Sequence, residues 1–295
     1  MTKVNFTAKL GKITAIMGPD EAERRTLTDL IGQRRRYGEY AGDIIVNETD
    51  TDLQYEDAVC FVPRKTLYIP GLTYYDLVLY SARLRIPDIK YLHNIYTERT
   101  TMENDYLLEK RVNEVLDIMG LTKMKFRVIE ERPVLRGELG GDLRRLSIAM
   151  EIVALPPVIV LEDPLYGMDP GVSVKVFDCL KRLSRRGHVV VCSLVKPLPQ
   201  IFEAVDSLVL LSNGRSIYSG EIKYLESFFC SAAIGYKRKK ATDMVDFLMD
   251  IALGTERPQT QREAHSPHTM QELMEKSAMF DAPRFGRDYV SANDA

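Results

Sequence analysis

Short apolar runs alternate with amphipathic stretches along the first 253 residues of the chain. Brief apolar runs bounded by turn residues are typical of strands, whereas apolar positions three and four apart are typical of helices. The apolar runs predict strands at 11–17, 43–46, 58–62, 158–163, 188–195 and 207–215. The helical spacing predicts helices at 72–87, 107–121, 142–155, 170–186 and near 198–205.

From residue 158 onward the predicted strands and helices alternate. The first of these strands, "VIVLED" at 158–163, is a continuous apolar run that ends in two acids, as a strand buried on both faces would. Strands that alternate with crossover helices form a parallel sheet covered on both sides. We therefore predict an α/β fold.

Composition and charge restrict the classes of protein to which the chain can belong. The chain has 295 residues, is 45% hydrophobic and carries a formal net charge of −2, so it can bury a large core. This near balance gives no support to nucleic-acid binding by bulk charge. No stretch approaches the roughly 20 apolar residues that cross a bilayer, and the N-terminus lacks a signal-peptide pattern. The four widely spaced cysteines predict buried thiols in a reducing compartment, and hence a cytoplasmic chain.

The chain becomes polar beyond Gly254. The stretch "TERPQTQREAHSPHT" has no hydrophobic periodicity and contains two prolines. Such a composition is typical of linkers and tails. We predict one folded domain over 1–254 and a polar linker or tail over 255–295.

A break near the N-terminus has the position of a phosphate-binding loop. In "IMGPDEAERRTLTDLIG" (16–32) a strand ends at Met17, Gly18 and Pro19 interrupt it, and "TLTDLI" looks like the first turns of a helix. A loop that cradles phosphate needs glycines and a lysine in that turn. This turn instead contains acids and an arginine. Its position in the chain therefore indicates a phosphate-binding loop, but its residues do not.

Two further features raise the significance of the acidic strand end. Acids at the end of a buried strand are common by themselves, because strand ends emerge at the surface. Here a double glycine, Gly140-Gly141, precedes the predicted helix at 142–155, where open backbone N–H groups could meet an anion. After Glu162-Asp163 comes "GMDP", a turn that can place Asp169, six residues beyond Asp163, near the same face.

Together these segments resemble the ATPase domain of ABC transporters. "LGGDLRRLSIAMEIVALPPVIVLEDPLYGMDP" is similar to the signature helix, Walker B strand and D-loop of that family. "FVPRKTLYIPGLTYYDLVLYSARLRIP", "NGRSIYSGEIKYLESFF" and "ATDMVDFLMDIA" resemble segments of its subfamily G. The resemblance extends in unbroken order from residue 5 to about residue 253. It is therefore much more specific than any single motif.

By this resemblance the stretch from Gly18 to Thr26 corresponds to the family's phosphate loop. The invariant glycines fall on Glu21 and Glu23, the lysine on Arg24 and the magnesium-binding hydroxyl on Arg25, with Thr26 one position late. Two glutamates should prevent the backbone from forming an anion nest without strain. Each carboxylate would also repel phosphate by roughly 3 kcal/mol at about 5 Å and an effective dielectric near 20.

The other nucleotide-site positions also depart from the family pattern. The Q-loop glutamine falls on Arg64, the switch histidine on Val195 and the signature serine on Leu139, while Gly140 and Gly141 remain. The Walker B acids occur in reversed order. Asp163 therefore stands at the general-base position, with a side chain one methylene shorter than glutamate. Glu162 stands at the metal-binding position, and Glu162 and Thr26 are the candidate Mg²⁺ ligands. A displacement of about 1 Å at a reacting group can reduce a rate about a hundredfold.

The resemblance implies a P-loop NTPase core at about 5–71 and 142–230, with a small β subdomain and a helical subdomain inserted at about 72–141. It also implies ATP and Mg²⁺ as ligands, a second ATPase domain in a head-to-tail dimer, and a transmembrane partner at the cytoplasmic face of a membrane. Because so many site residues are changed, our interpretation is weak or absent ATP binding, lost hydrolysis and a mainly structural or allosteric role. Two alternatives stay open: an active ATPase with altered motifs, and a soluble regulatory or scaffold protein on the same fold.

Overall fold

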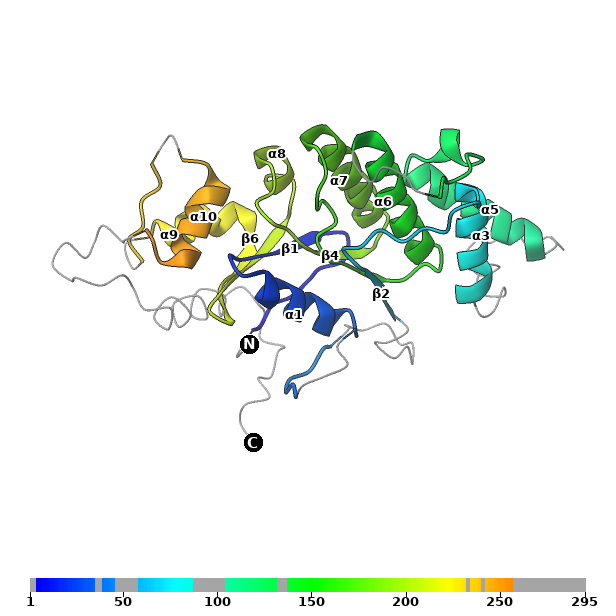
Figure 1. Ribbon diagram of the computed structural model, residues 1–295. Coiled ribbons are helices and arrows are strands. Elements are labelled where there is room, and N and C mark those ends of the chain that lie inside the picture. The colour runs from blue at the N-terminus through cyan, green and yellow to red at the C-terminus, as the bar shows by residue number, and fades with distance from the viewer. Residues whose placement is uncertain are drawn as a thin grey trace. The chain divides into compact units, whose positions relative to one another are not determined.

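The computed structural model describes residues 4–34, 39–45, 58–86, 104–131, 137–231, 234–239 and 242–256 (Figure 1). They fall into two compact units, each built from separate chain segments. The first unit comprises Met1–Lys9, Thr14–Leu27 and Ser193–Ala295, and the second Leu10–Ile13 and Thr28–Cys192.

Three parallel strands form the centre of the second unit. Strands β2 (Val59–Val62), β3 (Val158–Leu161) and β4 (Val189–Ser193) are adjacent, in the register Val59↔Val158 and Val158↔Val189. All four β3 side chains are buried, which explains the continuous apolar run of this strand.

Helix α6 (Gly137–Ile152) contacts β2 and packs beside α7 (Pro170–Arg185) (Figure 1). Three further helices pack against this pair or against one another: α3 (Tyr74–Arg85), α5 (Asn104–Ile118) and the short η1 (Thr122–Met124). Helix α3 begins with a complete capping box, in which Thr73 and Asp76 each accept the other's backbone N–H. Pro170 opens α7, where its fixed φ suits the first helical turn.

The first unit is built around a hairpin. Strand β1 (Ile13–Met17) pairs in parallel with β5 (Ser207–Ser212), and β5 pairs in antiparallel with β6 (Arg215–Glu221). Asn213 and Gly214 form the two-residue turn, both with positive φ, as in a type I′ hairpin. The remaining helices are α8 (Pro199–Phe202), η2 (Ile222–Tyr224), α9 (Leu225–Phe229) and α10 (Met244–Leu253).

In the second unit β2, β3 and β4 run parallel in that order. In the first unit β5 lies between β1, which runs parallel to it, and β6, which runs antiparallel. Helix α1 (Glu21–Ile31) follows β1 after three residues. This is the mostly parallel α/β arrangement that the sequence predicts, and it fits a P-loop NTPase core of the ABC type.

Most predicted elements are confirmed, and a few predictions are wrong. The strand predicted at 43–46 does not form at 43–45. The chain is exposed there and Ile45 is 71% accessible, so pairing as a strand would gain no burial of apolar side chains. Strand β6 was not predicted. Three cysteines are buried as expected, but Cys230 is exposed.

The linker or tail at 255–295 falls outside the described residues except for Thr255 and Glu256. Within the described residues, no helix combines the length and the hydrophobicity that a membrane crossing needs.

Candidate nucleotide site

The turn after β1 is a helix in this structure, where the resemblance implies a phosphate loop. Helix α1 begins at Glu21, five residues before the start suggested by "TLTDLI". The backbone N–H of Arg24 already bonds the Asp20 carbonyl at 3.4 Å. No residue from Gly18 to Thr26, all of them described, has a positive φ. The alternating backbone that makes an anion nest is therefore not formed here.

The physical cause is local. Glu21, Ala22, Glu23 and Arg24 are helix formers, and Glu21 and Glu23 stand where the resemblance places glycines that would hold a loop open. Asp20, directly before the helix, accepts the Ala22 N–H on Oδ1 at 2.8 Å and so caps the N-terminus of α1. Acids in the first turn also interact favourably with the helix dipole. The positive end of α1 thus meets a carboxylate of its own chain.

The arginine at the lysine position points back into the fold. Arg24 is only 4% exposed, and its Nη1 donates to the Gly18 carbonyl. Gly18 itself is required by close packing, since a Cβ there would lie 2.7 Å from the Leu211 carbonyl oxygen. Arg25 is exposed and Thr26 is partly buried. A buried guanidinium bonded to its own loop is not oriented as a phosphate ligand.

The Walker B acids lie in the second unit, directly after β3. Glu162 and Asp163 are 8% and 7% exposed, and Asp163 has a φ of 38°. The Glu162 N–H bonds the Val62 carbonyl at 2.9 Å, and its Oε2 accepts the Arg64 N–H at 3.2 Å. The carboxylate at the metal-binding position therefore already bonds the segment after β2.

Arg144 supports this acidic end, and sequence reasoning missed it. It extends from α6 and is 1% exposed. Its guanidinium donates to four backbone carbonyls, two in the segment after β2 and two after β3: Pro63, Arg64, Glu162 and Pro164. Burial lowers the pKa of Arg144 to about 10, although the Glu162 and Asp163 carboxylates raise it, so the group stays charged at neutral pH. Two basic residues in "DLRRLS" within an apolar helix face were the available signal.

Arg64, at the Q-loop position, stacks on an aromatic ring. Its guanidinium carbon lies 3.3 Å from the centre of the Tyr166 ring, and Tyr166 is 62% exposed. A planar cation over a tyrosine face is a favourable contact. It differs chemically from the neutral amide of the family pattern, which can both donate and accept hydrogen bonds.

The signature glycines lie inside a helix, which corrects the prediction that they precede it. Helix α6 begins at Gly137, so Gly140 and Gly141 are its fourth and fifth residues. In an α-helix the N–H of the fifth residue bonds the carbonyl of the first. A Cβ on Gly141 would lie 2.3 Å from Cγ1 of Val172, so Gly141 allows α6 and α7 to pack closely. The sequence missed the earlier start because "GELGG" is rich in glycine.

The last two predicted site residues lie on the surface. Asp169 is the N-cap residue of α7 but its side chain makes no capping bond, and it is exposed. Val195 follows β4 and is 53% exposed, with no polar side-chain atom for a phosphate. His188, near the other end of β4, bonds the Pro156 carbonyl through Nδ1 at 2.7 Å.

The predicted residues therefore form two groups. Gly18, Arg24, Arg25, Thr26 and Val195 belong to the first unit, and Arg64, Gly140, Gly141, Glu162, Asp163 and Asp169 to the second. Among the described residues, no cluster of three or more histidine, cysteine, aspartate or glutamate side chains could hold a metal ion. The magnesium role of Thr26 and Glu162 stays a prediction.

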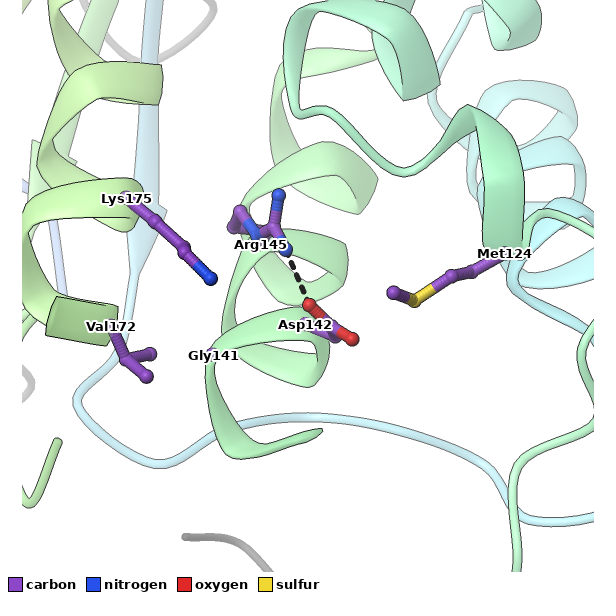
Figure 2. A pocket seen from close by; sticks show the side chains of 6 residues that line it. All are labelled: Met124, Gly141, Asp142, Arg145, Val172 and Lys175. Carbon is purple, nitrogen blue, oxygen red and sulfur yellow. Dashed lines mark hydrogen bonds and ion pairs between the residues drawn. The ribbon is translucent and has the colours of Figure 1, made fainter. Parts of the chain in front are cut away.

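A small cavity of about 100 Å³ lies between η1, α6 and α7. Figure 2 shows Lys175 at the left, Met124 at the right, and Arg145 between them, in an ion pair with Asp142. Gly141 and Val172 complete the lining. Pockets for nucleotide-sized ligands measure roughly 300 Å³ or more, so this cavity is not a nucleotide pocket.

The mostly parallel strands and the acids after β3 are features expected of an ATPase domain of the ABC type. No protein-family model matches the chain. Curated proteins do match it over most of its length.

The chain is 30% identical to "ABC-type transporter claG" of Penicillium crustosum over 84% of its residues. It is 27% identical to "ABC transporter G family member 12" of Dictyostelium discoideum over 86%. To "Broad substrate specificity ATP-binding cassette transporter ABCG2" of Sus scrofa it is 29% identical over 86%. The chain belongs with the ATPase domains of the G subfamily of ABC transporters. It spans 31%, 38% and 36% of the lengths of these three relatives.

Proposed function

We propose that this chain is a G-subfamily ABC transporter ATPase domain that has lost ATP hydrolysis and binds ATP weakly or not at all. Its role is then structural or allosteric. It completes a head-to-tail pair with a second ATPase domain and transmits movement to a transmembrane domain at the cytoplasmic face of a membrane. We further propose that the domain occupies 1–254, with its helical subdomain at about 72–141.

The observation that carries this proposal is the start of α1 at Glu21. A phosphate loop binds through consecutive backbone N–H groups that point into a concave turn. In this chain the Arg24 N–H bonds Asp20, and the Ala22 N–H bonds the Asp20 carboxylate. Phosphate would have to displace that carboxylate and unwind the first turn of α1.

The second unit supports the same proposal independently. Asp163 at the general-base position is shorter than the usual glutamate, and Arg144 holds a buried positive charge close to Asp163 and Glu162. A carboxylate that ends one methylene short lies farther from the water that it would activate, and general-base catalysis depends on that distance.

The proposal is tested by substitutions that restore the family's phosphate-loop residues. We compare the wild-type chain with the variant Glu21→Gly/Glu23→Gly/Arg24→Lys/Arg25→Ser, following ATP-dependent thermal stabilisation and phosphate release with an active G-type ATPase domain present. The wild-type chain should add no Mg²⁺-dependent turnover to that of the active domain. The restored variant should gain stabilisation by ATP, because its loop regains the glycines, the lysine and the hydroxyl.

A partial variant, Glu21→Gly/Glu23→Gly, is the matched control. It frees the backbone without the lysine and serine, so it should gain less stabilisation by ATP than the fourfold variant. Mg²⁺-dependent turnover contributed by the wild-type chain would overturn the proposal in favour of an active ATPase with altered motifs. Failure of the wild-type chain to associate with any ATPase or transmembrane domain would favour the scaffold alternative.

A further inference from the structure

Glu23 makes a contact that its family position does not require. It stands where the phosphate loop has a glycine, and its Oε1 accepts the backbone N–H of Gly214. Gly214 is the second residue of the β5–β6 turn, 191 positions away along the chain. The other oxygen, Oε2, is buried and has no hydrogen-bond partner among the described residues. A carboxylate held this way fixes the first turn of α1 to the hairpin.

The same turn is connected to the C-terminal helix of this unit. The Ser212 hydroxyl donates to the Ala252 carbonyl at 2.6 Å, within the last turn of α10. Asn213 Nδ2 donates to the Ser212 hydroxyl oxygen at 3.3 Å. The last four carbonyls of a helix have no partner within it, so Ser212 satisfies one that would otherwise be buried unpaired.

Close packing on both sides of the 212–214 turn restricts movement of this hydrogen-bonded connection. Gly18 lies against Leu211 so closely that a Cβ would be 2.7 Å from its carbonyl oxygen. Helix α10 packs against β5, and most of its side chains are buried. The residues from Leu211 to Gly214 therefore contact the start of α1 on one side and the end of α10 on the other.

We propose that Glu23, the 212–214 turn and Ala252 form a brace that couples the start of α1 to α10 without nucleotide. The brace consists of the Glu23–Gly214, Asn213–Ser212 and Ser212–Ala252 hydrogen bonds. It fixes the position of α1 by a side chain of the chain itself. Its existence does not depend on whether ATP is hydrolysed, so it stands apart from the proposed function.

Hydrogen–deuterium exchange on the nucleotide-free chain tests the brace. Glu23→Gln keeps the shape and removes the charge that strengthens the Gly214 bond. It should speed exchange of the amides of α10 and of the 212–214 turn roughly tenfold, since a bond to a charged group is worth about that factor. Ser212→Ala should speed exchange at both ends, in α10 and in the first turn of α1.

Glu21→Gln is the matched control, because it removes the same charge from the same helical turn at an exposed position. It should leave α10 unchanged. In the double variant Glu23→Gln/Ser212→Ala the two effects on α10 should be less than multiplicative, as expected of members of one network. The proposal of a brace is overturned if Glu23→Gln speeds exchange only within α1. It is also overturned if the effects of Glu23→Gln and Ser212→Ala on α10 are multiplicative in the double variant. Circular dichroism confirms that each variant is folded before exchange is read.

Discussion

At the residue scale, the changed positions have new partners within their own unit. Asp20 bonds Ala22, Glu23 bonds Gly214 and Arg24 bonds Gly18. These contacts could not be predicted from the sequence, because they depend on where α1 begins. The assignment of these positions to a nucleotide site rests on the resemblance and stays a prediction.

Arg144 gives the clearest stability prediction at this scale. Arg144→Met should lower the free energy of unfolding by about 3 kcal/mol or more, because it leaves buried carbonyls and carboxylates without their cation. Arg186→Met is the control, since Arg186 forms a half-exposed pair with Glu114 and should cost less than about 1 kcal/mol. Urea unfolding measures both. Equal effects of the two substitutions would contradict the role given to Arg144.

His188 predicts a pH dependence. Burial lowers the pKa of His188 below its usual 6.5, so the unfolded chain binds a proton more readily than the folded one. The free energy of unfolding contributed by this group is then present above pH 6.5 and is lost as the pH falls through the folded-state pKa.

Urea unfolding between pH 7.5 and pH 5, for the wild-type chain and His188→Gln, checks this prediction. The wild-type chain should lose more stability with acidification than the variant. Identical pH profiles would show that His188 makes no contribution.

At the element scale, hydrophobic periodicity was a good guide to type and a poor guide to helix starts. Helices α3, α5 and α7 and strands β1, β2, β3, β4 and β5 lie close to their predicted positions. Both α1 and α6 begin five residues early, because their first turns are polar or glycine-rich and carry no apolar signal. Strand β6 was missed because "RSIYSGE" is too polar to stand out, and it forms by pairing with β5.

The contact between α6 and α7 predicts the effect of a single methyl group. Gly141→Ala should lower the free energy of unfolding by about 1–3 kcal/mol, since the new Cβ would lie 2.3 Å from Cγ1 of Val172. Gly171→Ala, at a glycine with open space around it, should change stability by less than about 0.5 kcal/mol.

Adding Val172→Ala to Gly141→Ala supplies a rescue, because it removes the clashing methyl. The double variant should lose less than the sum of the two single losses when all are compared by urea unfolding. Additive losses would mean that the cost of Gly141→Ala arises elsewhere.

At the scale of the whole molecule, the chain has the α/β fold and the sequence similarity of the ABC family, and we propose that the chemistry of its nucleotide site has changed. The similarity extends over most of the chain, which is why sequence reasoning could predict the class. At the positions that the resemblance assigns to phosphate, metal and water, the chain has other residues in both units. The packing that replaces them could not be predicted, because it arises from contacts between distant segments such as Glu23 with Gly214 and Arg144 with Pro63.

The most direct test of this account is a calorimetric titration of the wild-type chain with ATP, with and without Mg²⁺. We predict no saturable binding up to about 1 mM ATP, since ATP would have to displace Asp20 and unwind the start of α1. Micromolar, Mg²⁺-dependent binding would contradict the account, because it would mean that the loop opens and that Arg24 or Arg25 serves as a phosphate ligand.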